Sequence, residues 1–317
     1  MSDRGWALGR AVALIAVASL LSPISPVLLV FIPVALFLLA FRSEDWISVA
    51  TAVVILVFAF GNAGGRSSEI AWMAPRGWSL LLGGAFVALT VRSMRSGPLA
   101  RGLGAVGVAL LFIAGLGILR PAVLRELDWW MSVEIRHAAA VADGLLASLP
   151  ASADPALREQ FAAALYRWAG FQQQVYPALL ALASVASLGV AWFALGRLSG
   201  AKSVLAPVRE FRFADQLVWL LVGGLALLVL PLGAVAFRIG ENAALFMAML
   251  YLVRGLAIMM WAGAAVVTSA WSAWALTLAG LLLYPVAAGA ALVLGLSDTW
   301  LDLRGRMVRS GFGRGKR

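Results

Sequence analysis

The chain has 317 residues, of which 62% are hydrophobic and 13% are charged. This composition excludes a soluble globule of the same length, because so few charged side chains cannot cover its surface. With no cysteine and a single histidine, the sequence also excludes disulfides, thiolate catalysis and a multi-histidine metal site. The formal charge of +10 is spread over short loops and the chain ends, which favours membrane orientation over a nucleic-acid partner.

Long apolar runs follow one another along most of the sequence. A helix needs about 20 apolar residues to cross a bilayer core of roughly 30 Å, and the chain offers eight to nine such segments. We therefore predict an all-α fold, a polytopic transmembrane helix bundle that forms one integral membrane domain over residues 1–317. In chain order, the expected spans lie near residues 6–21, 26–41, 46–60, 78–91, 103–119, 175–195, 216–237, 242–268 and 273–296.

Segment 120–174 differs from the rest of the chain, since it holds five arginines, six acidic residues and the only histidine. We predict an extramembrane or interfacial helical insertion here, between the fifth and sixth spans. Its second half has the pattern of an amphipathic helix that Asp154 caps and Pro155 opens. Two interpretations stay open: the insertion lies on the membrane or caps the bundle, or it forms a lid over a substrate cavity.

The basic loops give the expected orientation, because cytoplasmic loops carry an excess of Lys and Arg. Arg92, Arg95 and Arg101 place the loop after the fourth span in the cytoplasm. By the same rule, we place the second basic loop, after the sixth span, in the cytoplasm. The basic tail at 303–317 is placed there as well. We predict a multi-pass protein of the cell inner (cytoplasmic) membrane, with the N-terminus and the C-terminal tail in the cytoplasm.

Nine simple crossings disagree with this orientation. Three crossings after the sixth span would leave the basic tail outside the cell, so one of the last three segments is expected to be re-entrant, broken or split. Pro231, Gly263 and Pro285 are the places where the helix pattern allows an interruption.

Arg254 lies deep in the eighth expected span, where a charged side chain costs at least about 2.5 kcal/mol. Three interpretations follow: an anchor hydrogen-bonded to backbone carbonyls, a cavity-lining residue that meets an anionic substrate, or a residue near the membrane edge that reaches the headgroups. Asn242 at the start of the same helix and Tyr251, three residues before Arg254, complete a candidate ligand-binding set.

Two charged motifs flank the last spans, VREFRFADQLVW at 208–219 and GLSDTWLDLRGR at 295–306. In the first motif, Asp215 is placed to cap the following helix. If both motifs face the cytoplasm, Asp298 or Asp302 can pair with Arg209 or Arg212, or the two motifs together form a docking surface. The candidate contact surface consists of Arg209, Phe211, Arg212, Asp215, Asp298, Trp300, Asp302 and Arg304.

The sequence contains no motif of a known catalytic site, such as a Walker loop, His-Glu-x-x-His or Gly-x-Ser-x-Gly. We therefore expect no enzyme, no cofactor and no metal site. Glycine pairs at 64–65, 83–84 and 223–224 are more typical of close helix approach than of a phosphate loop.

The stretches 209–219, 250–257 and 295–304 together resemble the YybS-like family of predicted bacterial membrane proteins, a domain of unknown function. The resemblance covers roughly residues 205–305, and Arg254 stands where that family is expected to carry a glutamine before Gly-Leu-Ala. The N-terminal part is similar in style to substrate-binding subunits of energy-coupling-factor vitamin transporters. In those subunits an Ala-xxx-Ala pattern docks the coupling subunit, and Ala7 and Ala11 match that pattern.

These features favour a small-molecule-binding or transport-associated subunit. We expect it to contact the lipid bilayer and a membrane-protein or coupling-subunit partner, and we expect no nucleic-acid partner. The alternative is a non-catalytic scaffold or regulatory subunit of a larger membrane complex. An intramembrane enzyme would need ionisable groups that converge in the core, and the spans contain few of them.

Overall fold

The computed structural model describes residues 26–61, 69–92, 97–147, 155–198, 211–266 and 282–303, with a few single residues between 271 and 306. The first expected span at 6–21, including Ala7 and Ala11, lies outside these residues, as does the glycine pair at 64–65. The chain divides into two compact units, Met1–Leu205 and Ala206–Arg317. The single membrane domain over 1–317 and the basic tail at 303–317 stay predictions.

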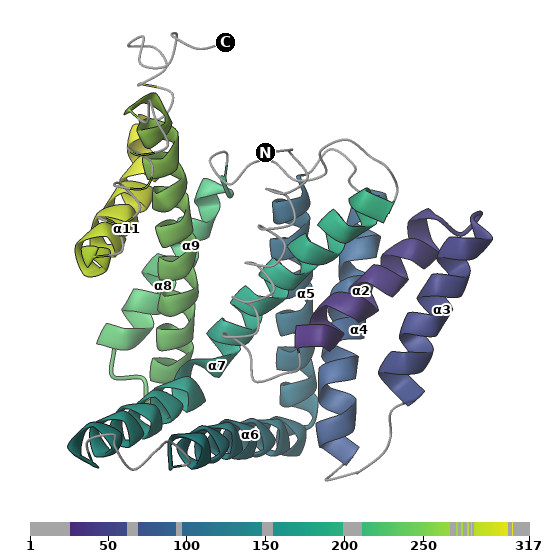
Figure 1. Cartoon of the computed structure of the whole chain (residues 1–317), viewed down its shortest axis with the longest axis horizontal. Coiled ribbons are helices and arrows are strands. Elements are labelled where there is room, and N and C mark those ends of the chain that lie inside the picture. Colours follow the sequence, from purple (N-terminus) through teal and green to yellow (C-terminus); the bar gives the residue numbers. More distant parts are fainter. Residues whose placement is uncertain are drawn as a thin grey trace. The chain divides into compact units, whose positions relative to one another are not determined.

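The described part of the chain contains helices and no strand, which confirms the all-α prediction. Helices satisfy their backbone polar groups within one segment, so they suit a chain this apolar. The N-terminal unit contains α2 (Pro26–Phe41), α3 (Trp46–Gly61), α4 (Glu69–Arg92), α5 (Pro98–Leu119), α6 (Pro121–Ala147) and α7 (Pro155–Leu198) (Figure 1).

The core of the N-terminal unit forms where α2 packs against α3, α4 and α7. Phe37 of α2 contacts Phe86 of α4 with ring centroids 5.0 Å apart, and Trp192 of α7 lies 5.5 Å from Phe86. Gly83 allows the close approach, since a Cβ atom there would lie 2.6 Å from Cδ1 of Leu36. This glycine therefore fits the predicted role in helix packing.

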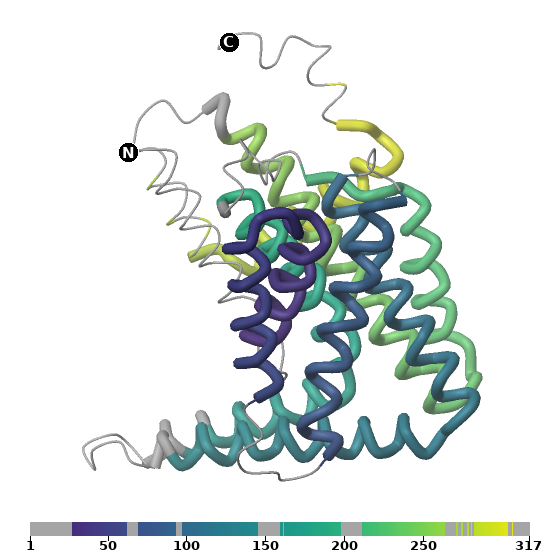
Figure 2. The backbone as a smooth tube through the Cα atoms, turned by 90° about the vertical axis from the view of Figure 1, so that its right-hand side faces the viewer, coloured from purple at the N-terminus to yellow at the C-terminus, as the bar shows by residue number. Residues whose placement is uncertain are grey.

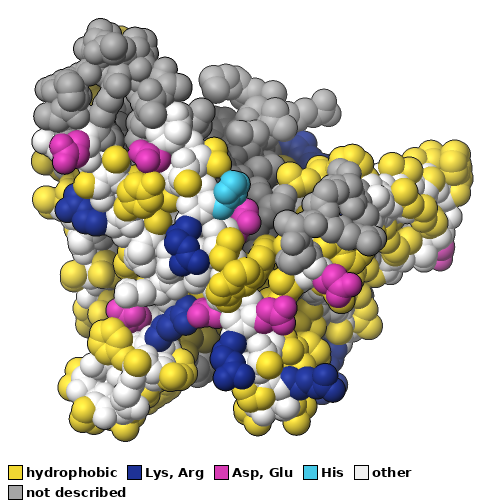
Figure 3. Space-filling model, turned by 90° about the horizontal axis from the view of Figure 1, so that it is seen from below, with side chains coloured by type: hydrophobic (Ala, Val, Ile, Leu, Met, Phe, Trp, Pro, Cys, Tyr) yellow, Lys and Arg dark blue, Asp and Glu magenta, His cyan; other side chains and the backbone are white. Residues whose placement is uncertain are grey.

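Helix α6 contacts α5 and α4 at their lower ends, and the first part of α7 packs along α6 (Figure 2). The predicted amphipathic helix and the sixth expected span are one continuous helix, α7, which changes direction along its length (Figure 1). Pro177 inside α7 is the residue type that kinks a helix. Seen from below, the surface over α6 and the first part of α7 mixes charged with hydrophobic side chains (Figure 3), as a helix pair at the headgroup layer would.

The basic loop predicted after the fourth span is shorter than expected. Arg101 belongs to the first turn of α5 and is buried, so it does not lie in a loop. Proline at the first helical position starts α5 at Pro98, before the apolar run that was used to place the span.

The C-terminal unit contains η2 (Asp215–Leu217), α8 (Val218–Val229), α9 (Ala234–Val266) and α11 (Tyr284–Leu301). The expected span at 216–237 is interrupted, because the chain leaves the helix at Leu230 and resumes it at Ala234. Pro231, one of the three predicted interruptions, lies in this break. Gly233 in the same break has φ of +93°, a conformation that favours glycine.

Gly263 lies within α9, so the helix continues past this predicted interruption. Pro285 lies in the first turn of α11, which begins at Tyr284 after a turn residue at Leu283, so the expected span at 273–296 is interrupted just before this proline. Proline is accepted there because the first backbone N–H groups of a helix have no partner within it.

Helices α9 and α11 pack with their backbones in direct contact. A Cβ atom at Gly255 would overlap the backbone oxygen of Ala291, and one at Gly295 would overlap the backbone oxygen of Tyr251. Gly224 and Gly240 likewise allow the backbones of α8 and α9 to approach closely. Small residues at these crossings are typical of helix pairs in membranes.

Four described helices are long and apolar enough to cross a membrane, namely Glu69–Arg92, Pro98–Leu119, Ala162–Arg197 and Ala234–Gly263. Shorter apolar helices are Val27–Phe41, Trp46–Gly61 and Asp215–Val229. These helices support the predicted class of protein, while the count of eight to nine membrane segments stays a prediction.

We expect Gly255→Ala to destabilise the C-terminal unit by about 1–3 kcal/mol, because the added methyl group must push α11 away from α9. Thermal unfolding of the detergent-solubilised protein measures the effect. Gly289→Ala is the matched control on α11, since a Cβ atom there meets nothing within 4 Å. Equal stability of the two variants would contradict the close packing.

Candidate functional site

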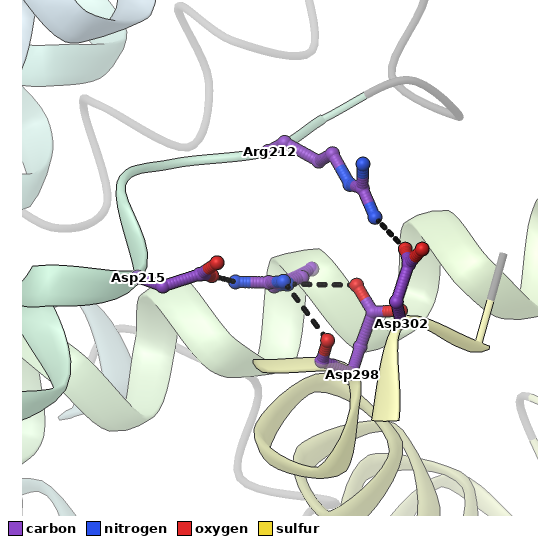
Figure 4. A network of polar contacts seen from close by, with 5 residues as sticks. Arg212, Asp215, Asp298 and Asp302 are labelled. Carbon is purple, nitrogen blue, oxygen red and sulfur yellow. Dashed lines mark hydrogen bonds and ion pairs between the residues drawn. The ribbon is translucent and has the colours of Figure 1, made fainter. Parts of the chain in front are cut away.

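The candidate site of the C-terminal unit centres on Arg254, which is only 2% exposed. Its Nε donates to Oδ2 of Asp298 at 2.9 Å, and its Nη1 donates to Oδ1 of Asp215 at 2.8 Å. The backbone oxygen of Asp298 accepts a third hydrogen bond from Nη2 at 3.3 Å. Figure 4 shows Asp215 and Asp298 pointing toward this guanidinium from two sides.

Three separate elements bring these groups together. Arg254 lies near the middle of α9, Asp215 begins η2, and Asp298 lies in the last turns of α11. Gly255 is the neighbour of Arg254 in the chain, and Gly295 lies one helical turn before Asp298. The close backbone contact at these glycines therefore sets the distance that the guanidinium has to bridge.

An aromatic side chain covers the guanidinium. The Cζ atom of Arg254 lies 5.2 Å from the ring centroid of Phe213, and the ring of Tyr251 packs edge-on against Phe213 at 5.2 Å. Tyr251 and Arg254 are three residues apart on α9, so they share one face of the helix. The cation–π contact and the two ion pairs together remove Arg254 from solvent.

A second ion pair joins the same two motifs. Nη2 of Arg212 contacts Oδ1 of Asp302, and Figure 4 shows the two side chains facing one another. Asp302 follows α11 in the left-handed conformation, with φ of 41°, which aspartate accepts more readily than most residues. Both side chains are about half exposed, at 51% and 53%, so this pair contributes at most about 1 kcal/mol.

The cluster joins one guanidinium to two carboxyl groups, so its formal charges leave a surplus of one negative charge. Asp215 has a side chain that is 60% exposed and remains solvated, whereas the side chain of Asp298 is fully buried. Oδ1 of Asp298, the hydroxyl of Tyr251 and the hydroxyl of Thr299 are buried and have no hydrogen-bond partner among the described residues. Such atoms are uncommon in folded proteins, and a bound water molecule or ion often satisfies them.

The structure brings together six of the predicted site residues: Arg212, Asp215, Tyr251, Arg254, Asp298 and Asp302. Asn242 is not among them, because its side chain donates to the backbone oxygen of Arg238 within α9 at 2.8 Å. Trp300 is exposed on α11, and the ring of Phe211 packs edge-on against that of Phe213, with ring centroids 6.2 Å apart. Arg209 and Arg304 lie outside the described residues.

Two roles differ from the sequence prediction. Asp215 makes no side-chain cap of η2, since its carboxylate accepts from Arg254 instead. Arg254 is held mainly by carboxylates and only secondarily by a backbone carbonyl. The pairing of Arg254 with the two charged motifs was missed because those motifs were placed at the membrane surface.

Within the described residues, no group of three or more His, Asp or Glu side chains is placed to hold a metal ion. The arrangement is that of a polytopic helical membrane protein with a buried ionic cluster at one end of its C-terminal unit. The chain belongs to the family described as "Predicted membrane protein (DUF2232)", which it matches over residues 11–299. No curated protein and no solved structure matches the chain.

The family match contains Arg212, Asp215, Arg254 and Asp298, so most of the cluster lies within the matched region. The family match and the resemblance described from the sequence agree that the chain belongs to a family of predicted membrane proteins. The YybS-like name and the likeness to energy-coupling-factor subunits stay predictions.

We expect Arg254→Leu to lower the apparent free energy of unfolding by about 3–5 kcal/mol, because it leaves the charge of Asp298 buried without a partner. Asp298→Leu alone has a similar cost, whereas the double variant loses less than the sum of the two. Thermal or denaturant unfolding in detergent measures all three. Arg212→Ala, which breaks the exposed pair, is the control and changes stability by at most about 1 kcal/mol. Strictly additive losses would refute the coupling.

Proposed function

We propose that the protein is a non-catalytic scaffold or regulatory subunit of a membrane complex. The observation that carries this proposal is the internal use of Arg254, whose guanidinium is buried and occupied by Asp215 and Asp298. An anionic substrate would have to displace two carboxylates that already satisfy the guanidinium. This geometry supports the second of the two functions considered from the sequence.

The charged end of the C-terminal unit supplies the proposed contact surface. It exposes Asp215, Arg212 and Asp302, which the ion pairs join to their partners, and Trp300 is exposed on α11 two residues before Asp302. Arginine and tryptophan are the residue types that most often dominate binding at protein interfaces. A fixed pattern of charge selects one partner over others, because a mismatched partner would meet like charges.

A transport-associated, small-molecule-binding subunit is the second candidate, and one observation favours it. The unpartnered Oδ1 of Asp298 and the hydroxyl of Tyr251 are polar atoms in the interior of a membrane protein, and ionisable groups in such places often belong to ligand or ion pathways. The surplus negative charge of the cluster suits a cationic or hydrogen-bond-donating ligand. The chemistry is the reverse of the anionic substrate that Arg254 suggests from the sequence alone.

We expect Arg212→Glu to reduce recovery of a partner protein about tenfold, since it removes one charge of the contact surface and repels Asp302. Affinity purification in mild detergent, with mass spectrometry of proteins and small molecules, measures the change. Arg125→Glu, an exposed arginine of α6, is the matched control. Unchanged partner recovery together with a bound cationic small molecule in the wild type would select the transport candidate instead.

The proposed setting is the cell inner membrane, with the N-terminus and the C-terminal tail in the cytoplasm. Five crossings from a cytoplasmic N-terminus place the insertion at 120–174 on the outer side. The basic character of the segments around Arg92 and of the tail supports this orientation.

The natural chain has no cysteine, so single cysteines report the orientation without background. In intact spheroplasts, we expect a membrane-impermeant maleimide to label Ala138→Cys on α6 and to leave Ser310→Cys in the tail unlabelled until lysis. The opposite pattern would invert the orientation. Labelling of both positions in intact cells would place the tail outside and remove the need for an interrupted segment.

A further inference from the structure

The N-terminal unit contains a second buried arginine, and this one has no carboxylate partner among the described residues. Arg101 is 9% exposed, and its Nε is buried without a hydrogen-bond partner. None of the described acidic residues forms an ion pair with it. Arg254, in the other unit, has two carboxylates for the same charge.

Two aromatic rings form the wall against which the guanidinium lies. Its Cζ atom is 4.8 Å from the ring centroid of Trp192 and 5.6 Å from that of Phe86. Phe37 and Phe41 pack edge-on or tilted against Trp192, each with ring centroids 5.9 Å apart, so the wall is fixed by the core of the unit. The fixed rings orient the flat guanidinium by covering its face. A ligand would therefore have to approach the edge of the guanidinium, where the N–H donors lie.

The ring contacts alone do not satisfy a buried arginine. Each cation–π contact contributes about 0.5–2 kcal/mol, while removing an ion from water costs several kcal/mol. A guanidinium also presents five N–H donors, and aromatic faces replace none of their hydrogen bonds to water. Among the described residues, the buried Nε of Arg101 therefore still lacks an acceptor for its hydrogen bond.

The start of α5 adds further donors to the same place. Arg101 lies in its first turn, and a helical side chain leans toward the N-terminus of its helix. No side chain caps α5, and its first intrahelical hydrogen bond runs from Arg101 N to Gly97 O, so the N–H groups of Leu99 and Ala100 come before it. Free N–H groups and the positive end of a 22-residue helix attract an anion.

The surrounding charge favours an anion as well. Helices α4 and α7 end on the side of the bundle where α5 begins, and they end at the exposed Arg92 and just after the exposed Arg197 (Figure 1). Among the described residues of the N-terminal unit, the acidic residues on this side are Glu44 and Asp45 in the turn after α2. Asp45 accepts hydrogen bonds from Ser48 and the backbone of Ile47, and its carboxylate also faces Arg42.

We propose that Arg101 and the N-terminus of α5 form a binding site for a phosphate group, carried by an anionic lipid headgroup or by a soluble phosphate compound. A guanidinium edge and a helix N-terminus are the two protein features that best match phosphate oxygens. The aromatic wall positions the arginine, and the exposed arginines of α4 and α7 raise the local concentration of anions. The site is independent of the contact surface in the C-terminal unit.

Binding to the purified full-length protein in detergent tests this site. Native mass spectrometry detects retained phosphatidylglycerol, and thermal unfolding with inorganic phosphate or glycerol 3-phosphate detects the soluble ligand. We expect Arg101→Gln to weaken phosphate binding about tenfold or more, because a charge-assisted pair is lost. Arg125→Gln, an exposed arginine of α6 that belongs neither to this site nor to the arginines around it, is the control and is expected to change binding less than about threefold.

Each outcome decides the proposal. Binding of phosphatidylglycerol that depends on Arg101 and resists inorganic phosphate identifies a lipid site, while competition by inorganic phosphate identifies a soluble ligand. If Arg101→Gln does not fold, phosphate binding is measured with Arg101→Lys instead. This variant keeps the positive charge but loses the two N–H donors that contact a phosphate together. Absence of phosphate binding to the wild type, or equal loss in the Arg125 and Arg101 variants, would overturn the site.

Discussion

The cost of removing a charge from water is the constraint on which the C-terminal unit depends. Arg254 is almost fully buried, so its guanidinium must find carboxylates within the protein. It finds them on two other elements, η2 and α11, and thereby ties three parts of the unit to one point. The same pairs fix Phe213 and Tyr251, whose rings cover the cluster. Much of the polar structure of this unit therefore follows from the placement of a single arginine.

Glycine packing and ion pairing support one another in this unit. The glycines at 255 and 295 bring the backbones of α9 and α11 into contact, and this contact puts Asp298 within hydrogen-bond distance of Arg254. Ion pairs alone would tolerate several helix separations, because arginine is long and flexible. Backbone contact alone would fix the separation but not the rotation of α11. The two together allow one arrangement of the helix pair.

Much of the fold could be predicted from apolar runs, since α2 and α3 begin where the runs begin and end within one residue of the expected bounds. The runs did not show that α7 continues from the amphipathic segment into the span, because a helix needs no change of character to continue through an interface. The pairing of Arg212 with Asp302 was among the pairings predicted, because the two residues carry opposite charges and both lie next to the ends of expected spans. The partners of Arg254 could not be predicted, because they depend on the distance between helices. The glycines set this distance, and the periodicity of apolar residues does not show it.

The break at Leu230–Gly233 bears on how the chain enters the membrane during synthesis. Helix α8 has 12 residues and is about 18 Å long, so it falls short of a bilayer core of roughly 30 Å. Its exposed carbonyl groups after Val229 would be left in lipid if α8 entered alone. Helix α9 packs along α8 through Gly224 and Gly240, and it is long enough to span. The two helices therefore depend on one another as a hairpin, in which α9 supplies the length that α8 lacks.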